Sequence, residues 1–165
     1  MRTLGHIITS AGVGLATYHR YKSAPAAVAS FLAGWMIDID HLFDYVKAHG
    51  WRWSWFHFKE ARHEHYSGKL YLPLHSYELL AVLWILLRKE HHRPYRNGIT
   101  LSILTHLLLD QKCNPCRRPA TYFLAHRIRQ QFDATKILSL AELAPSVVPM
   151  PASARNLLSH AAPRN

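Results

Sequence analysis

Hydrophobic and polar positions follow a helical period along most of this 165-residue chain. Apolar runs punctuated by Gly, Pro, Ser and Asn predict five helices, at about Leu4–Arg20, Ala26–Ile37, His75–Glu90, Ile99–Gln111 and Ala120–Phe132. The pattern of the second run allows its helix to continue through Val46. The expected fold is all-α, a compact bundle of about five helices within one domain of residues 1–140.

Two segments depart from this pattern. Between His49 and Lys69, Trp and Phe residues are interleaved with basic residues, which predicts a long aromatic-basic loop. Such a mixture is typical of a membrane interface or a substrate-access loop, although aromatics folded back onto the helices explain it equally well. Residues 141–165 are rich in Ala, Pro and Ser and lack periodicity, which predicts a poorly ordered tail.

The last predicted helix is amphipathic. Leu124, Ile128 and Phe132 recur at i, i+4 and form an apolar stripe, while Arg127 and Arg129 fall on the opposite face. This pattern predicts a surface helix with its arginines in solvent.

Charge and hydropathy narrow the classes of partner. The net charge of +10 suits an anionic partner: nucleic acid, an anionic membrane surface or a phosphate-bearing molecule. Because the positive charges are scattered and follow no groove-reading motif, the sequence disfavours nucleic acid. The 49% of hydrophobic residues excludes global disorder.

A membrane location is left open by the apolar runs. None reaches the roughly 18 to 20 uninterrupted residues of a clean span, and Ala24–Ile37 and Leu72–Leu87 come nearest. A compact bundle is favoured over short inserted hairpins. We therefore expect a cytoplasmic or inner-membrane-associated protein, with peripheral or shallow membrane contact.

The histidine content of the chain is a stronger indication of metal chemistry than its cysteine content. The chain holds 13 histidines, and so high a content favours metal binding, proton transfer or a position on a hydrated surface. Its two cysteines form a single Cys-x-x-Cys, Cys113 and Cys116, which is weak evidence for zinc or redox chemistry and equally fits two ordinary thiols beside a turn.

Aspartates within apolar runs carry the main functional argument. Asp38, Asp40, Asp44 and Asp110 lie in or beside such runs, and each has a histidine nearby. Burying an ionised carboxylate is costly unless a cation or several hydrogen bonds compensate for it. The combination predicts a divalent metal held jointly by carboxylates and imidazoles.

Two clusters have ligand spacing. Asp38-Ile39-Asp40-His41 can supply ligands to one metal or bridge two, the alternative being a helix-capping aspartate. His106 and Asp110 are i, i+4 neighbours on one face of an otherwise aliphatic helix. There they can chelate one ion, or pair so that the carboxylate orients the imidazole.

Other candidates lie at helix starts and in the loop. His75 precedes a helix and can be a ligand, with Glu78 as a partner behind it. Ser76 stands where free N–H groups favour an anionic substrate. His6 sits among apolar residues of the first helix, and His57 of the aromatic-basic loop can reach an open site as a substrate contact.

The order of these motifs resembles the YdjM-like membrane-bound metal-dependent hydrolases. That family shows an early His, an Asp-x-Asp-His after an apolar helix, a Thr-His-Ser and a late His-x-x-x-Asp. Here the motifs extend from Gly5 to Asp110, with Leu74 where the family often has Thr. The ligand types are also similar, remotely, to those of the all-helical zinc-dependent phospholipase C and nuclease group.

The sequence and this resemblance together predict a metal-dependent hydrolase. One or two divalent ions, zinc by ligand preference, are expected on His6, Asp38, Asp40, His41, His75, His106 and Asp110. Metal-activated water would attack, Asp40 would act as the catalytic proton acceptor, and the substrate would be an anionic phosphoester, small or lipid. The alternatives are a non-catalytic metal-binding protein at the membrane and, less favoured, a basic nucleic-acid-binding module.

Overall fold

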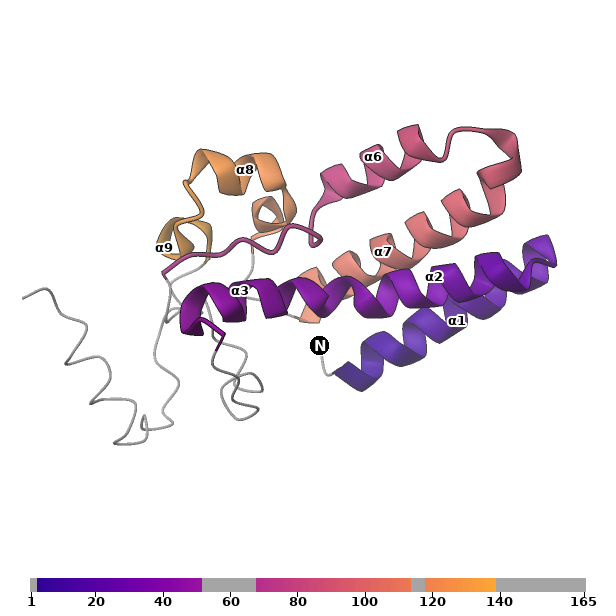
Figure 1. The fold of residues 1–165 in the computed structure, drawn as a ribbon, viewed down its shortest axis with the longest axis horizontal. Coiled ribbons are helices and arrows are strands. Elements are labelled where there is room, and N and C mark those ends of the chain that lie inside the picture. The colour runs from indigo at the N-terminus through magenta and orange to yellow at the C-terminus, as the bar shows by residue number, and fades with distance from the viewer. Residues whose placement is uncertain (1–2, 52–67, 114–117, 139–165) are drawn as a thin grey trace, which may run out of the picture.

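The computed structural model describes residues 3–51, 68–113 and 118–138, and in these ranges the chain is all-α, as expected (Figure 1). The predicted tail and most of the aromatic-basic loop, including His57, lie outside the described residues. The helices are α1 Thr3–Tyr21, α2 Ala24–Met36, α3 Asp40–His49, α6 Tyr77–Leu86, α7 Arg93–Cys113, α8 Leu124–Arg129 and α9 Ala134–Ile137, with 3₁₀ turns at Ile37–Ile39, Glu90–His92 and Pro119–Tyr122.

Helix α2 and helix α3 form one long helical segment. The Ser23 side chain accepts a hydrogen bond from the Ala26 N–H, and Pro25 occupies the first turn, so α2 begins where these signals place it. The 3₁₀ turn Ile37–Ile39 then joins α2 to α3 almost in line (Figure 1). The predicted continuation through Val46 is confirmed, and α3 ends only at Gly50, whose φ is 67°.

Helices α1, α2 and α7 pack closely through small residues. Gly34 of α2 faces α1 and α7 so closely that a methyl group there would overlap the hydroxyls of Ser10 and Ser102. The Ser30 hydroxyl donates to the Gly98 carbonyl at 2.8 Å, which fixes α2 against α7. Close packing brings the residues at one end of these three helices within reach of one another.

The start of α7 differs from the prediction. The sequence pattern predicts a helix that starts at about Ile99, directly after the turn-forming pair Asn97-Gly98, but α7 begins at Arg93 and runs through both residues. Gly98 is buried, and a Cβ there would meet the Thr17 side chain at 2.8 Å. The glycine therefore serves a close helix contact rather than a turn.

Large apolar side chains of the bundle point outward. Their exposed members include Leu4, Ile8, Leu15, Val28, Trp35, Ile85, Leu86, Leu101 and Leu108. Among the described helices, Ala24–Lys47 is long and apolar enough to cross a membrane by length and composition, with 28% of its best window buried. The apolar run Ala24–Ile37 alone is too short for a span, and its continuation through α3 supplies the additional length.

The predicted helix Ala120–Phe132 is wrong as a single element. It divides into the 3₁₀ turn Pro119–Tyr122 and the short α8, followed by Gln131 and Phe132 at left-handed φ angles of 54° and 58°. Arg127 is buried, whereas Ile128 is exposed. The expected solvent-facing arginine thus points inward, because backbone carbonyls of the segment before α6 bind its guanidinium.

Two buried apolar clusters hold the segment that precedes α6. Leu70 and Leu72 pack with Ala134 and Ile137 of α9. Leu74, two residues further on, packs against the cluster that contains Leu107 of α7. The segment is therefore held between the bundle and the C-terminal helices, and it delivers His75 to the end of the bundle.

Candidate metal centre

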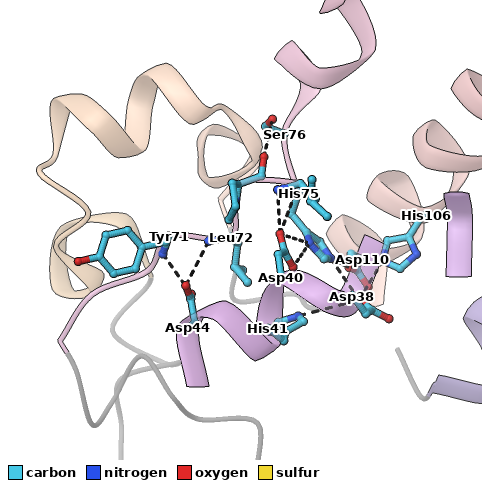
Figure 2. Close-up of polar contacts among 12 residues, drawn as sticks. Asp38, Asp40, His41, Asp44, Tyr71, Leu72, His75, Ser76, His106 and Asp110 are labelled. Carbon is cyan, nitrogen blue, oxygen red and sulfur yellow. Dashed lines mark hydrogen bonds and ion pairs between the residues drawn. The ribbon is translucent and has the colours of Figure 1, made fainter. Parts of the chain in front are cut away.

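Four of the predicted ligands converge at this end of the bundle. Asp38 comes from the 3₁₀ turn after α2, His75 from the segment before α6, and His106 and Asp110 from α7 (Figure 2). One ligand atom from each lies within 4.8 Å of the others. The described residues thus contain a buried Asp/His group that can bind a metal ion.

The distances between ligand atoms match the spacing around a single ion. Asp38 Oδ1 lies 3.3 Å from the Nε2 atoms of both His75 and His106. Asp110 Oδ2 lies 3.6 Å from the same atom of His75 and 3.3 Å from that of His106. Ligands at about 2.0–2.2 Å from a tetrahedral ion are separated by about 3.3–3.5 Å, so the group has the dimensions of a metal site.

The two imidazoles present unsatisfied nitrogens to this space. The Nε2 atoms of His75 and His106 are buried and form no hydrogen bond of standard geometry with any described residue; their polar neighbours are the oxygens of Asp38 and Asp110, in ion-pair contact at 3.3 to 3.6 Å. Buried polar atoms are nearly always satisfied in folded proteins. A cation between these nitrogens and the carboxylates would satisfy them.

His75 is oriented by Asp40 rather than ligated beside it. Its Nδ1 lies 3.0 Å and 3.1 Å from the two oxygens of the Asp40 carboxylate. A carboxylate behind a metal-binding histidine fixes the ring and leaves the other nitrogen bare. Asp40 is itself buried and also accepts the backbone N–H groups of Leu74 and His75.

His106 is held in a similar way by the backbone. Its Nδ1 lies 2.8 Å from the Gly34 carbonyl, a contact that the close approach of α2 to α7 makes possible. With Nδ1 donating to this carbonyl, Nε2 is the bare nitrogen and points toward Asp38 and Asp110. The small-residue packing of the bundle therefore positions a candidate ligand directly.

His6 lies behind the group instead of within it. Its ring stacks on His106 with centroids 3.9 Å apart, and its Nε2 lies 3.1 Å from Asp110 Oδ1. The other Asp110 oxygen faces the two histidines. The structure thus places His6 as a partner of Asp110, and its predicted role as a ligand stays a prediction.

His41 and Asp40 form a second combination with His75. In this combination Asp40 already engages His75 Nδ1. His41 is 28% exposed, and its Nε2 lies 4.0 Å from Asp38 Oδ1. We therefore regard the Asp38–His75–His106–Asp110 group as the candidate metal centre and His41 as its neighbour on the more exposed side.

The remaining predicted residues take structural positions. Ser76 is buried, and its hydroxyl donates to the Pro73 carbonyl at 3.2 Å. Glu78 does not lie behind His75: its carboxylate accepts the Leu124 and Ala125 N–H groups and caps α8. The predicted substrate contact of Ser76 remains a prediction, as does that of His57.

Two further residues support the centre. Asp44, noted in the sequence only as an acid in an apolar run, accepts the N–H groups of Tyr71 and Leu72. Arg127, which the sequence pattern placed in solvent, is 1% exposed and donates to three carbonyls between Tyr71 and His75. Helical periodicity gave no signal for Arg127, because its partners lie more than 50 residues away in the chain.

The acids and imidazoles shift one another's pKa. Burial lowers the pKa of His106, but Asp110 and Asp38 outweigh it and raise the pKa to about 9. His75 is likewise raised well above its usual pKa, since Asp110, Asp38 and Asp40 outweigh its burial. Burial raises the pKa values of Asp38 and Asp110, but the histidines outweigh it and hold both well below the usual range. The metal-free group is therefore ionised on both sides, and a cation would replace imidazole protons.

The donor set of two imidazoles and two carboxylates suits a divalent ion such as zinc. Fold and site together define an all-helical protein with a buried Asp/His group able to bind a metal. No protein-family model, curated protein or solved structure matches the chain.

Proposed function

We propose that this protein is a metal-dependent hydrolase of phosphoesters, with zinc held by Asp38, His75, His106 and Asp110. The observation that carries the proposal is the pair of buried, unsatisfied Nε2 atoms at ligand spacing from two carboxylates. A bound divalent ion would lower the pKa of a coordinated water toward neutrality and neutralise charge on a phosphoryl oxygen.

The exposed side of the group sets the direction of substrate approach. Asp38 is the most exposed of the four ligands, with 32% of its side chain accessible, and His41 lies beside it. A substrate reaching the centre would pass these two residues. His75, His106 and Asp110 are buried and can only bind or orient.

In the proposed reaction, His41 rather than Asp40 would accept the proton of the attacking water. Asp40 is buried behind His75 and already accepts several N–H groups. His41 lies at the exposed edge, where attacking water would stand. It would accept the proton as water attacks phosphorus, and the proton would pass to the oxygen that leaves as the ester P–O bond breaks.

The outward-facing apolar side chains support a membrane-associated protein and a lipid phosphoester as substrate. Small residues fill the α1–α2–α7 contacts while large apolar ones cover the outside, as in helices that contact lipid. The two helix connections at the far end of the bundle carry Lys22, Arg88 and Lys89, which suit anionic headgroups (Figure 1).

Turnover by the zinc-loaded full chain tests the proposal. We expect hydrolysis of a chromogenic phosphodiester and faster hydrolysis of an anionic phospholipid in vesicles. Asp38→Asn should abolish both activities, His41→Ala should lower kcat while zinc stays bound, and His91→Ala, an exposed histidine far from the centre in sequence, should change neither.

The alternative is a non-catalytic metal protein. Four protein ligands are also the number that closes a structural zinc site. Stoichiometric zinc without turnover of any phosphoester would favour this alternative and reject the hydrolase. Recovery of the protein in the soluble fraction, with no binding to anionic vesicles, would reject the membrane part of the proposal.

A further inference from the structure

The segment of residues 71–75 is buried at Leu72 and His75 and exposed at Pro73, and all its backbone polar groups are satisfied. Asp44 accepts the N–H groups of Tyr71 and Leu72, and Asp40 accepts those of Leu74 and His75. Pro73 has no N–H. Both aspartates belong to α3, so side chains of one helix accept every backbone N–H of the segment.

Arg127 binds the carbonyl groups of the same segment. Its Nη1 donates to the carbonyls of Tyr71 at 2.8 Å and Leu72 at 2.6 Å, and its Nη2 donates to the His75 carbonyl at 3.0 Å. The carbonyls of Pro73 and Leu74 are bound by Ser76. One buried guanidinium therefore donates to the carbonyls of Tyr71 and His75, and it shares the carbonyl of Leu72 with the His75 N–H, which lies 3.1 Å from it.

The segment needs this support because its backbone is strained. Leu72 has a φ of 38°, in the left-handed region that side chains with a Cβ rarely adopt. Such a residue persists only where its surroundings hold it. Without Arg127, the carbonyls of Tyr71 and His75 would lose these donors, and that of Leu72 would keep only the His75 N–H, so the segment would relax toward another conformation.

Relaxation of this segment would move a ligand of the metal centre. His75 is its last residue, and Arg127 binds the His75 carbonyl while Asp40 binds its backbone N–H and its ring Nδ1. The orientation of His75, with Nε2 toward Asp38 and Asp110, is thus fixed by contacts on both sides of its backbone.

We infer that Arg127 is a positioning residue for the metal centre, acting through the backbone of residues 71–75 to aim His75 at the ion. The inference rests on the proposed metal binding. The hydrogen bonds of Arg127 described above go to backbone carbonyls; its fork of N–H donors fits several carbonyls at once, which a lysine ammonium cannot reproduce.

Helix α8 is anchored so that it can serve this role. Glu78, three residues after His75, accepts the first N–H groups of α8 at 2.9 Å each. The Glu78 carboxylate also interacts with the charge of Arg127. The helix that supplies Arg127 is therefore tied to the first turn of α6, directly beside the segment that Arg127 holds.

Zinc affinity and the visible spectrum of bound Co²⁺ test the inference in the full chain. Arg127→Met should weaken zinc binding about 10- to 100-fold, the usual effect of removing a partner behind a ligand. It should also change the Co²⁺ absorption, which reports ligand geometry. Arg127→Lys should lie between Met and the native residue. The matched control, Arg129→Met, changes an exposed arginine of the same helix and should leave both readouts unchanged.

Folded Arg127→Met and Arg127→Lys variants with native zinc affinity and a native Co²⁺ spectrum would overturn the inference and leave the metal site standing. If Arg127→Met does not fold, Arg127→Lys, which retains the charge, decides by the same two readouts. A native chain that binds neither zinc nor Co²⁺ would reject the metal-centre proposal and this inference with it.

Discussion

The segment of residues 71–75 and the candidate metal centre at its end both place polar groups in the interior, but they differ in one respect. In the segment, Asp40, Asp44, Arg127 and Ser76 satisfy every backbone donor and acceptor. In the centre, the Nε2 atoms of two histidines have no hydrogen-bond partner among the described residues. Both regions hold opposite charges, so burial alone does not explain the difference.

This difference separates the residues that support the backbone from the residues that are candidates to bind an ion. Side chains supply hydrogen-bond partners to the backbone of all five residues of the segment, but none of the described side chains supplies such a partner to the two imidazole Nε2 atoms. It orients their Nδ1 atoms, through Asp40 and the Gly34 carbonyl, and leaves the Nε2 atoms to a cation. Ligand spacing from two carboxylates, together with this lack of hydrogen bonds, identifies the two Nε2 atoms as candidate metal-binding atoms without reference to any related protein.

Zinc addition should give the largest change of all, an increase in the free energy of unfolding. An ion that binds only the folded chain stabilises it by about 4 kcal/mol when its free concentration is 1,000 times its Kd. We expect a corresponding rise in the free energy of unfolding, measured in urea, that EDTA reverses. Equal stability with zinc and with EDTA would mean that the centre is satisfied without an ion.

Ligand and supporting residues should separate by the size of their effects. His106→Ala removes a ligand atom and should weaken zinc binding by more than about 100-fold, beyond the about 10- to 100-fold expected for Asp40→Asn, which only orients His75. Competition with a chromophoric chelator measures both, with His91→Ala as the control. An Asp40→Asn effect larger than that of His106→Ala would make Asp40 a ligand.

The pH dependence of the metal-free chain should oppose that of zinc binding. The pKa of His106 is raised from 6.5 to about 9 in the folded chain, so its stabilising effect is complete below pH 6.5 and is lost as pH rises through 9. The lowered pKa values of Asp38 and Asp110 stabilise the fold above about pH 4, and this contribution is lost as pH falls.

Metal-free stability should therefore be highest between about pH 4 and pH 6.5, as measured by urea unfolding in EDTA. Zinc affinity should instead rise with pH, because the ion displaces imidazole protons. If both quantities rose together above pH 6.5, the histidines would not be paired with the carboxylates in the metal-free protein.

The smallest effects should come from the helix packing that supports the centre. Gly34→Ala places a methyl group against Ser10 and Ser102 and should destabilise the fold by about 1–3 kcal/mol. Gly12→Ala on α1 meets nothing within 4 Å and should be neutral or stabilise by up to about 1 kcal/mol. Similar urea midpoints for both variants would argue against the close α1–α2–α7 contact.

Local patterns in the sequence predicted much of this protein. Apolar runs and helix-start residues placed α1, α2 with its continuation, and α6, because those signals act within a few residues. The same reasoning failed at Asn97-Gly98 and at residues 120–132. There, contacts with Thr17 and with the 71–75 segment outweigh local preference, and a sequence read alone does not contain those distances.

The sequence by itself determined an all-helical chain whose acids and histidines occur in apolar surroundings, because helical period and the cost of buried charge are properties of neighbouring residues. Only the tertiary structure divided those residues into ligands and supports. It placed Asp40 behind His75 and His6 behind Asp110, and turned Arg127 from solvent to the backbone of His75. That division depends on which atoms of distant segments meet, and spacing along the chain does not fix it.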